Sequence, residues 1–145
     1  MSSKYVSNLV KVIHNKYWDG YIPVRFSEFL KGLNIKLYEK PDIGDGAVSE
    51  ILFDDNQWKI FVSLNEPYVR RRFALAHSIG HIVLGHVTQE EKHIDTVEDF
   101  LLNSDDVVEK EANQFALELL CPENAIDLVF LKSKNFDDLC DKLEL

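Results

Sequence analysis

The chain has little of what marks secreted or membrane proteins. Only two cysteines, Cys121 and Cys140, occur among its 145 residues. No stretch approaches the roughly 18 consecutive apolar residues of a membrane-spanning helix. The first residues also lack the long apolar region of a secretory signal peptide. We therefore expect two reduced thiols, no membrane partner and a cytoplasmic location.

Positive charge is scarce as well. Lysine and arginine number 16 against 25 aspartate and glutamate residues, which gives a formal net charge of -9. Proteins that bind phosphate backbones usually carry a basic patch, and the one basic cluster here, at residues 70–72, is too short to form one. Direct binding of nucleic acid is therefore disfavoured, whereas an acidic surface suits a protein partner with basic character.

The remaining composition is that of a folded globular domain. Hydrophobic residues make up 46% of the chain and charged residues 28%, so we expect one domain over residues 1–145. Helical and alternating patterns predict two helices, then three strands with a hairpin, then helices to the end. The predicted ranges are 4–17 and 26–33 for the helices, and 34–38, 47–53 and 58–64 for the strands. Segregated helices and strands indicate an α+β fold.

The next predicted helix, residues 65–85, carries the first candidate for chemistry. It is apolar on nearly every side from residue 73 to residue 84, which is typical of a buried helix. His77 and His81 interrupt it four residues apart, so both lie on one face and can bind one metal ion. The alternative is two core histidines that hydrogen-bond to their neighbours. Two buried imidazoles without partners cost a few kcal/mol, which favours the metal site.

Glu109 is the candidate third ligand of such a site. It lies on a predicted helix, residues 106–120, beside an inward stripe that contains Ala112 and Ala116. Small alanine side chains let two helices approach closely, which would bring the Glu109 carboxylate to the histidines. Catalytic zinc sites have three protein ligands and a water in the fourth position.

Other roles for Glu109, and other acids, remain open at this point. The pattern Asp106-x-x-Glu109 is that of a capping box, in which Glu109 would serve only the helix start. Glu111 and Glu118 are competing ligands, although the helical phase directs both further toward solvent.

Two linked motifs are similar to those of a known family. The segment RRRFALAHSIGHIVLGH (70–86) followed by EKEANQFALELLCPE (109–123) resembles the ImmA/IrrE family of bacterial metallopeptidases. The resemblance covers about residues 5–125. It implies a zincin-like domain with a small antiparallel or mixed sheet and a metal-binding helix pair. It also implies one Zn²⁺ held by His77, His81 and Glu109, with a water in the open position.

The same resemblance implies a biological role. Family members are encoded in mobile elements such as phages and in stress loci, and they act as antirepressors on helix-turn-helix repressors. No helix-turn-helix segment is evident in this chain, so DNA recognition would belong to a repressor-type partner protein.

Ser78 is where the chain departs from the family, which has a glutamate directly after the first histidine. That glutamate takes a proton from the zinc-bound water, a general-base contribution of roughly 10²–10⁴-fold. A serine hydroxyl is too weak a base near neutrality, so we expect proteolysis to be impaired or altered. A substitute base would have to come from the polar segment 87–104, where Glu90, Glu91 and Glu98 are candidates.

Three hypotheses follow. The first is a zinc-binding metallopeptidase-like regulator that acts on a repressor with weak or redirected proteolysis. The second is a catalytically inactive pseudoprotease that regulates by binding its partner, as an antirepressor or a toxin–antitoxin-like protein. The third is an active protease in which Ser78 was introduced by design to trap the substrate.

Overall fold

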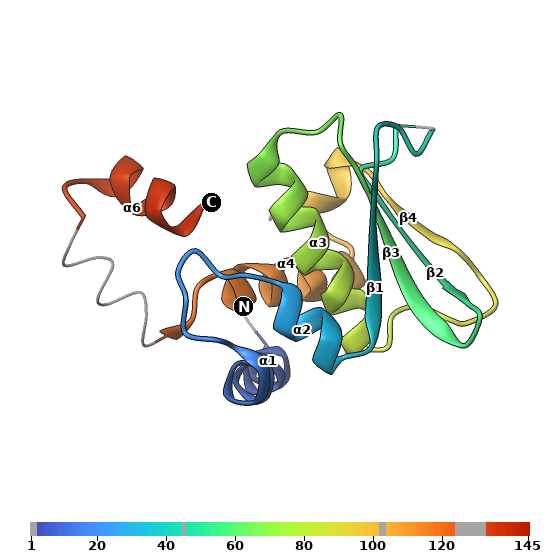
Figure 1. Ribbon diagram of the computed structural model, residues 1–145, viewed down its shortest axis with the longest axis horizontal. Helices are drawn as coiled ribbons and strands as arrows, with labels where there is room; N and C mark the ends of the chain where they lie inside the picture. Colours follow the sequence, from blue (N-terminus) through green and yellow to red (C-terminus); the bar gives the residue numbers. More distant parts are fainter. Residues whose placement is uncertain (1–2, 45, 102–103, 124–132) are drawn as a thin grey trace.

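The computed structural model describes residues 3–44, 46–101, 104–123 and 133–145 (Figure 1). Its elements, in chain order, are α1 (Lys4–Tyr17), α2 (Ser27–Gly32), β1 (Ile35–Lys40), β2 (Ser49–Asp54), β3 (Gln57–Ser63), α3 (Tyr68–Val83), β4 (His93–Asp95), the 3-10 helix η1 (Val97–Phe100), α4 (Val107–Leu120) and α6 (Phe136–Leu143). The predicted α+β class is confirmed, and the predicted order of helices and strands holds as far as α3. None of the helices in these ranges is long and apolar enough to cross a membrane.

The sheet is mixed and has four strands in the order β1-β3-β2-β4. Strand β1 runs parallel to β3, whereas β2 pairs antiparallel with both β3 and β4. The predicted hairpin is β2–β3, and its turn residues Asp55 and Asn56 have φ values of 54° and 58°. Two positive φ angles are what a tight type I′ hairpin turn requires, and aspartate and asparagine tolerate them.

Strand β4 was not predicted, since residues 87–104 read as polar and irregular. It is only three residues long, and it pairs with β2 through Ser49–Asp95 and Ile51–His93. A strand this short shows no recognisable alternation of its own. Its position means that β2, which sequence alone could leave as a free edge, is covered on that side by the chain itself.

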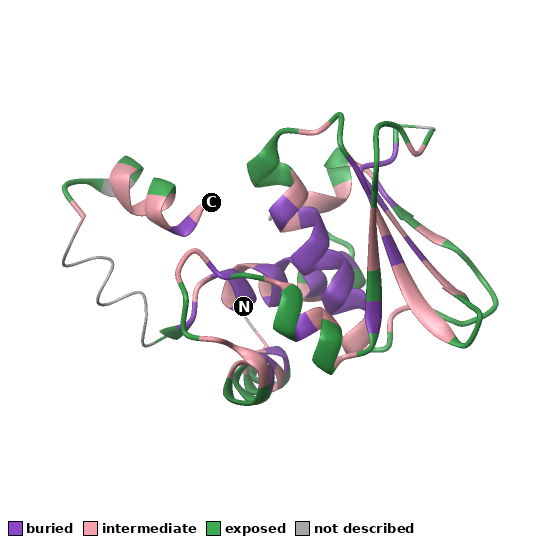
Figure 2. Ribbon diagram, in the orientation of Figure 1, coloured by how far each residue is buried: buried purple, intermediate pink, exposed green. Residues whose placement is uncertain are grey.

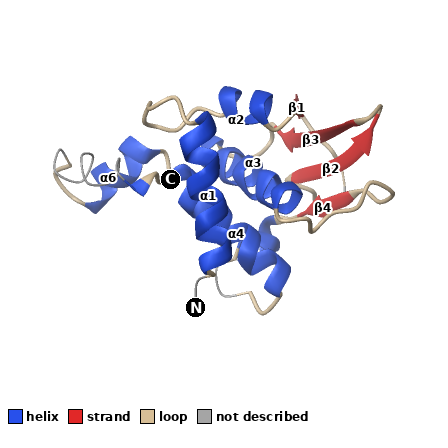
Figure 3. Ribbon diagram, turned by 90° about the horizontal axis from the view of Figure 1, so that it is seen from below, coloured by secondary structure: helices blue, strands red, loops and turns tan. Residues whose placement is uncertain are grey.

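The helices form a layer on one face of the sheet. Figures 1 and 3 show α3 between the sheet and helices α1 and α4, α2 beside β1, and α6 on the side away from the sheet. Buried residues concentrate along α3 and α4 (Figure 2). Both helices therefore direct side chains into the same buried region. That region contains polar as well as apolar side chains.

Gly80 lets α3 and α4 pack closely. A Cβ atom at this position would lie 2.9 Å from Cδ1 of Phe115, closer than packed side chains allow. Ala112 and Ala116 on α4 are completely buried, as the sequence predicted. The absence of bulk at these positions brings the start of α4 alongside the histidines of α3.

Candidate metal centre

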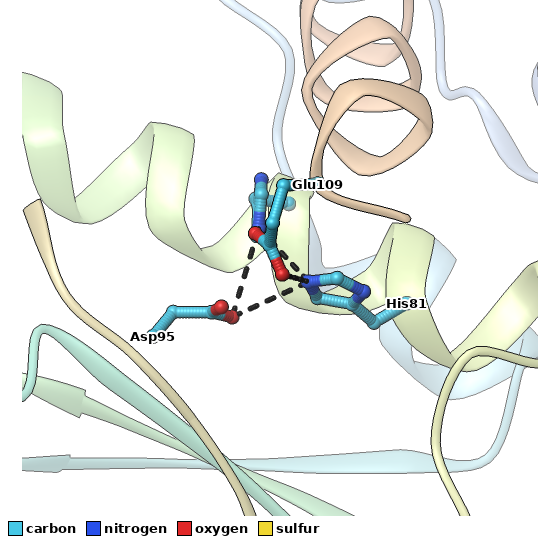
Figure 4. Close-up of side chains that lie close together, drawn as sticks. His81, Asp95 and Glu109 are labelled. Atoms are coloured by element: carbon cyan, nitrogen blue, oxygen red, sulfur yellow. Dashed lines mark hydrogen bonds and ion pairs between the residues drawn. The ribbon is translucent and has the colours of Figure 1, made fainter. Parts of the chain in front are cut away.

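Four buried side chains from three elements converge between the sheet and the helices. His77 and His81 come from α3, Asp95 from β4 and Glu109 from α4, and one donor atom from each lies within 4.8 Å of all the others. Their exposed fractions are 0%, 0%, 1% and 6%. Figure 4 shows His81, Asp95 and Glu109 directed toward one another. We call these four residues the convergent group.

The distances within the convergent group suit a single metal ion. The two Nε2 atoms lie 2.9 Å apart, and Glu109 lies 2.9 Å from His77 Nε2 through Oε2 and 3.3 Å from His81 Nε2 through Oε1. Asp95 Oδ2 lies 3.6 and 3.5 Å from the same two nitrogens. Ligands about 2.0–2.1 Å from a tetrahedral zinc ion are about 3.3 Å from each other, so the donors have the spacing of a zinc coordination shell.

The protonation of His77 is fixed by Asn113. The Asn113 amide nitrogen donates to the backbone carbonyls of Asp99 and Leu101, at 3.1 and 3.3 Å. Its oxygen must therefore face His77 Nδ1, which donates to it at 2.8 Å. Because Nδ1 keeps its proton, the neutral form of the ring has its lone pair on Nε2, directed into the convergent group.

A second chain of hydrogen bonds orients His81. Glu111 accepts from His86 Nε2 at 2.9 Å, and burial lowers the pKa of His86, which keeps this ring neutral near pH 7. His86 Nδ1 is then an acceptor, and His81 Nδ1 donates to it across 3.0 Å. In the neutral form of the His81 ring, Nε2 therefore also directs a lone pair into the group, as a metal-binding imidazole does.

Asp95 has one satisfied oxygen and one that is not. His93 Nε2 donates to Oδ1 at 2.9 Å, whereas Oδ2 is buried and has no hydrogen-bond partner among the residues that the structure describes. A buried carboxylate oxygen without a partner is costly. A cation between Oδ2 and the two Nε2 atoms would supply the missing partner, so the residues present fit a metal ion.

Protons stabilise the convergent group when no metal is bound. Burial opposes the charged imidazoles, but the nearby carboxylates of Asp95 and Glu109 outweigh it, raising the pKa of His77 and raising that of His81 to about 9. Burial likewise opposes ionised carboxylates, yet the two histidines hold the pKa values of Asp95 and Glu109 below the ordinary range.

Metal affinity is therefore expected to rise with pH. Below about pH 9 the metal must displace a proton from His81, so apparent affinity should increase about tenfold per pH unit for each proton displaced, and level off above that pH. Competition against a chromophoric chelator between pH 6 and 9 measures the slope. A flat profile would show that the imidazoles carry no protons in the metal-free protein.

Removing the outer partner of His77 should weaken metal binding. Asn113→Ala frees the ring to rotate and to change tautomer, so the dissociation constant for Zn²⁺ should rise about 10–100-fold, the usual effect of losing such a partner. Gln114→Ala is the matched control, because Gln114 bonds to Ser3, Ser7 and Glu118 on the other side of α4. Equal affinities in the two variants would contradict the role given to Asn113.

Of the acids weighed from sequence, the structure brings Glu109 to the histidines. Asp106 does cap α4, accepting from the backbone of Val108 and Glu109, but the Glu109 carboxylate contacts the histidines. Glu111 instead bonds to His86, and Glu118 bonds to Ser7. The predicted ligands His77, His81 and Glu109 thus lie together, although their binding of a metal stays a prediction.

Asp95 was missed by sequence reasoning. The acids considered in its segment were Glu90, Glu91 and Glu98, and all three are exposed and outside the convergent group. The signal available was weak: His93 and Asp95 are two residues apart, so they share one face of a strand. That signal means something only once the strand itself is recognised.

Ser78 lies next to the convergent group in sequence but is not part of it. The residue is completely buried, and its Oγ finds no hydrogen-bond partner within the described part of the chain. No carboxylate or imidazole is therefore supplied from this position. The place that the family resemblance assigns to a general base holds a group that cannot act as one near neutral pH.

Comparison with known proteins gives one match. The family model described as Peptidase_M78, IrrE N-terminal-like domain, matches residues 31–144, which include the sheet, α3, α4 and the whole convergent group. A search among curated proteins finds no match to this chain.

Proposed function

The chain belongs to the Peptidase_M78 family of IrrE N-terminal-like domains, and from this we propose that it is a zinc-dependent, metallopeptidase-like regulator of a helix-turn-helix repressor, with impaired peptide hydrolysis. The observation that carries the proposal is the combination at the centre. Four metal donors converge, while Ser78 stands where the general base belongs.

Hydrolysis should be slow because the chain supplies ligands for a metal ion but no general base. A bound zinc ion would acidify a coordinated water and polarise a carbonyl group. The chain's own donors, His77, His81 and Glu109, can hold the ion. However, Ser78 cannot take the proton of an attacking water. The rate of hydrolysis is therefore expected to be lower by a factor of roughly 10²–10⁴.

A protein partner fits the surface better than a nucleic acid does. The net charge of -9 opposes direct contact with phosphate groups. An apolar groove of about 490 Å³ lies beside the convergent group, with Val69, Phe73, Val97, Phe100, Leu101 and Leu117 among its lining residues. Such a groove suits the apolar face of a peptide or helix, and DNA recognition would then belong to the partner.

A second candidate function is regulation by binding alone. It is favoured by the burial of the convergent group, whose members are at most 6% exposed. In addition, the rings of Phe73 and Phe100, which line the groove, both contact the His77 ring, at 6.2 and 4.8 Å between centroids. A partner in the groove would therefore meet aromatic side chains before it met the metal donors.

One experiment tests both functions. Zinc-loaded protein is added to a candidate repressor bound to its operator DNA, and release of the DNA and fragmentation of the repressor are followed together. We expect release with little or no fragmentation. The comparison is His77→Ala, with His14→Ala as control, because His14 bonds to the Leu119 carbonyl outside the centre.

The outcomes separate the candidates. Slow fragmentation that disappears in His77→Ala supports the impaired enzyme, and release without fragments supports regulation by binding. Rapid, complete cleavage by the unmodified chain would overturn both, as would a failure to bind the repressor or to release its DNA.

A further inference from the structure

We propose that Asp95 is a fourth protein ligand, so that the metal ion is enclosed by His77, His81, Asp95 and Glu109 with no position left for water or substrate. This inference rests on the proposed metal-binding function and deepens it. It differs from the expectation drawn from the family resemblance, which has three protein ligands and an open fourth position.

The distances separate a ligand from a base. Asp95 Oδ2 lies 3.6 and 3.5 Å from the two Nε2 atoms, close to the roughly 3.3 Å between neighbouring ligands of a tetrahedral zinc ion. A general base would instead reach the ion through the attacking water, and would stand one hydrogen bond of about 2.6–3.2 Å beyond that water. Oδ2 is therefore within the ligand shell.

The backbone of β4 holds Asp95 in this place. Val48 N–H donates to the Asp95 carbonyl at 2.9 Å, and the Ser49–Asp95 pair anchors the strand on β2. His93 lies on the same face of β4 as Asp95 and donates to Oδ1, which leaves Oδ2 for the ion. A ligating carboxylate is commonly held in this way by an outer hydrogen bond.

A metal centre with four protein ligands has a different function from one with three. Structural zinc sites are closed by four protein groups, whereas catalytic sites keep one position for water. Ser78 and Asp95 lie on separate elements, α3 and β4, and both the missing base and a fourth protein ligand oppose hydrolysis. We therefore infer that the metal centre of this chain is structural and holds the sheet and the helices together.

Cobalt substitution of the full-length protein tests the inference. The visible spectrum of bound Co²⁺ reports its coordination number, and azide changes that spectrum only if it can enter the coordination shell. We expect a four-coordinate spectrum in the unmodified protein that azide does not change. Asp95→Ala should lose at least about 100-fold in Co²⁺ affinity, beyond the loss typical of an outer partner, and its remaining bound cobalt should respond to azide.

Two control variants accompany the measurement. Asp95→Asn keeps the shape and an oxygen that can accept from His93, so it should lose less affinity than Asp95→Ala. Glu98→Gln removes one negative charge from the exposed part of the same segment and should leave affinity and spectrum unchanged. The azide titration of unmodified protein needs no variant, so a misfolded mutant does not prevent the test.

The results distinguish this inference from the proposed function. A centre that binds cobalt and responds to azide without any mutation would overturn the closed shell while leaving metal binding intact. Unchanged affinity in Asp95→Ala would do the same and would make Asp95 an outer group. No binding of Co²⁺ or Zn²⁺ at neutral pH would overturn the metal-binding function itself.

Discussion

Removal of the metal with a chelator is expected to lower the melting temperature by about 8–16 °C. At a free metal concentration about 1,000 times the dissociation constant, binding stabilises the native state by about 4.1 kcal/mol. For a domain of this size, 1 kcal/mol shifts the melting temperature by about 2–4 °C. The donors come from α3, β4 and α4, so the loss should affect the contact between both layers of the fold. Thermal denaturation with and without chelator measures the shift.

Controls identify the cause of that shift. Restoring Zn²⁺ should recover the original melting temperature. His77→Ala should melt close to the metal-free protein and respond little to chelator, whereas His14→Ala should behave like the unmodified chain. If protein shown to contain stoichiometric metal melted at the same temperature after chelation, the ion could not have a structural role.

The paired substitution Ser78→Glu with Asp95→Ala is expected to raise peptide hydrolysis by about 10²–10⁴-fold, the contribution of a general base. Asp95→Ala opens the fourth position for water, and Ser78→Glu supplies the group that takes the proton. Ser78→Glu alone should give little gain, because the fourth position stays filled. The rates of the unmodified protein, the two single variants and the paired variant are measured from cleavage of the candidate repressor, or of an unfolded protein such as casein.

The stability of the same variants is a second measurement, because the substitutions change the number of buried carboxylates. Ser78→Glu alone adds another carboxylate to a buried region that already contains Asp95 and Glu109, so this variant should be the least stable. The paired substitution restores the number of carboxylates and should recover part of the lost stability. Hydrolysis by Ser78→Glu as fast as by the paired variant would argue that Asp95 leaves the metal accessible.

Helical periodicity allowed much of the centre to be predicted from sequence. The separation of His77 and His81 fixes their common face on any helix, and the small residues Ala112 and Ala116 indicated which face of the next helix would lie against them. Glu109 follows from that phase. These three positions depend on local geometry and on one helix contact, which a sequence pattern can express.

The position of Asp95 in the centre could not be predicted from local sequence patterns. Asp95 lies in a polar stretch with several acids, and only the weak signal of His93 two residues before it separates it from Glu90 or Glu98. Its position is set by pairing between β4 and β2, residues far apart in the chain, and a three-residue strand is too short to show a period. The chain from His81 through His86 to Glu111 was likewise unforeseen, because it depends on how the end of α3 meets α4.

The separate locations of Ser78 and Asp95 have an evolutionary consequence. If Asp95 closes the metal centre as proposed, peptidase chemistry would require a change on the helix and another on the edge strand, and neither alone would be sufficient. A lineage that acquired Ser78→Glu first would carry an unfavourable buried charge, and one that lost Asp95 first would weaken its metal-supported fold. Under the proposed closed centre, both single steps would be disfavoured, so the absence of catalysis would persist because reversing it needs two changes together.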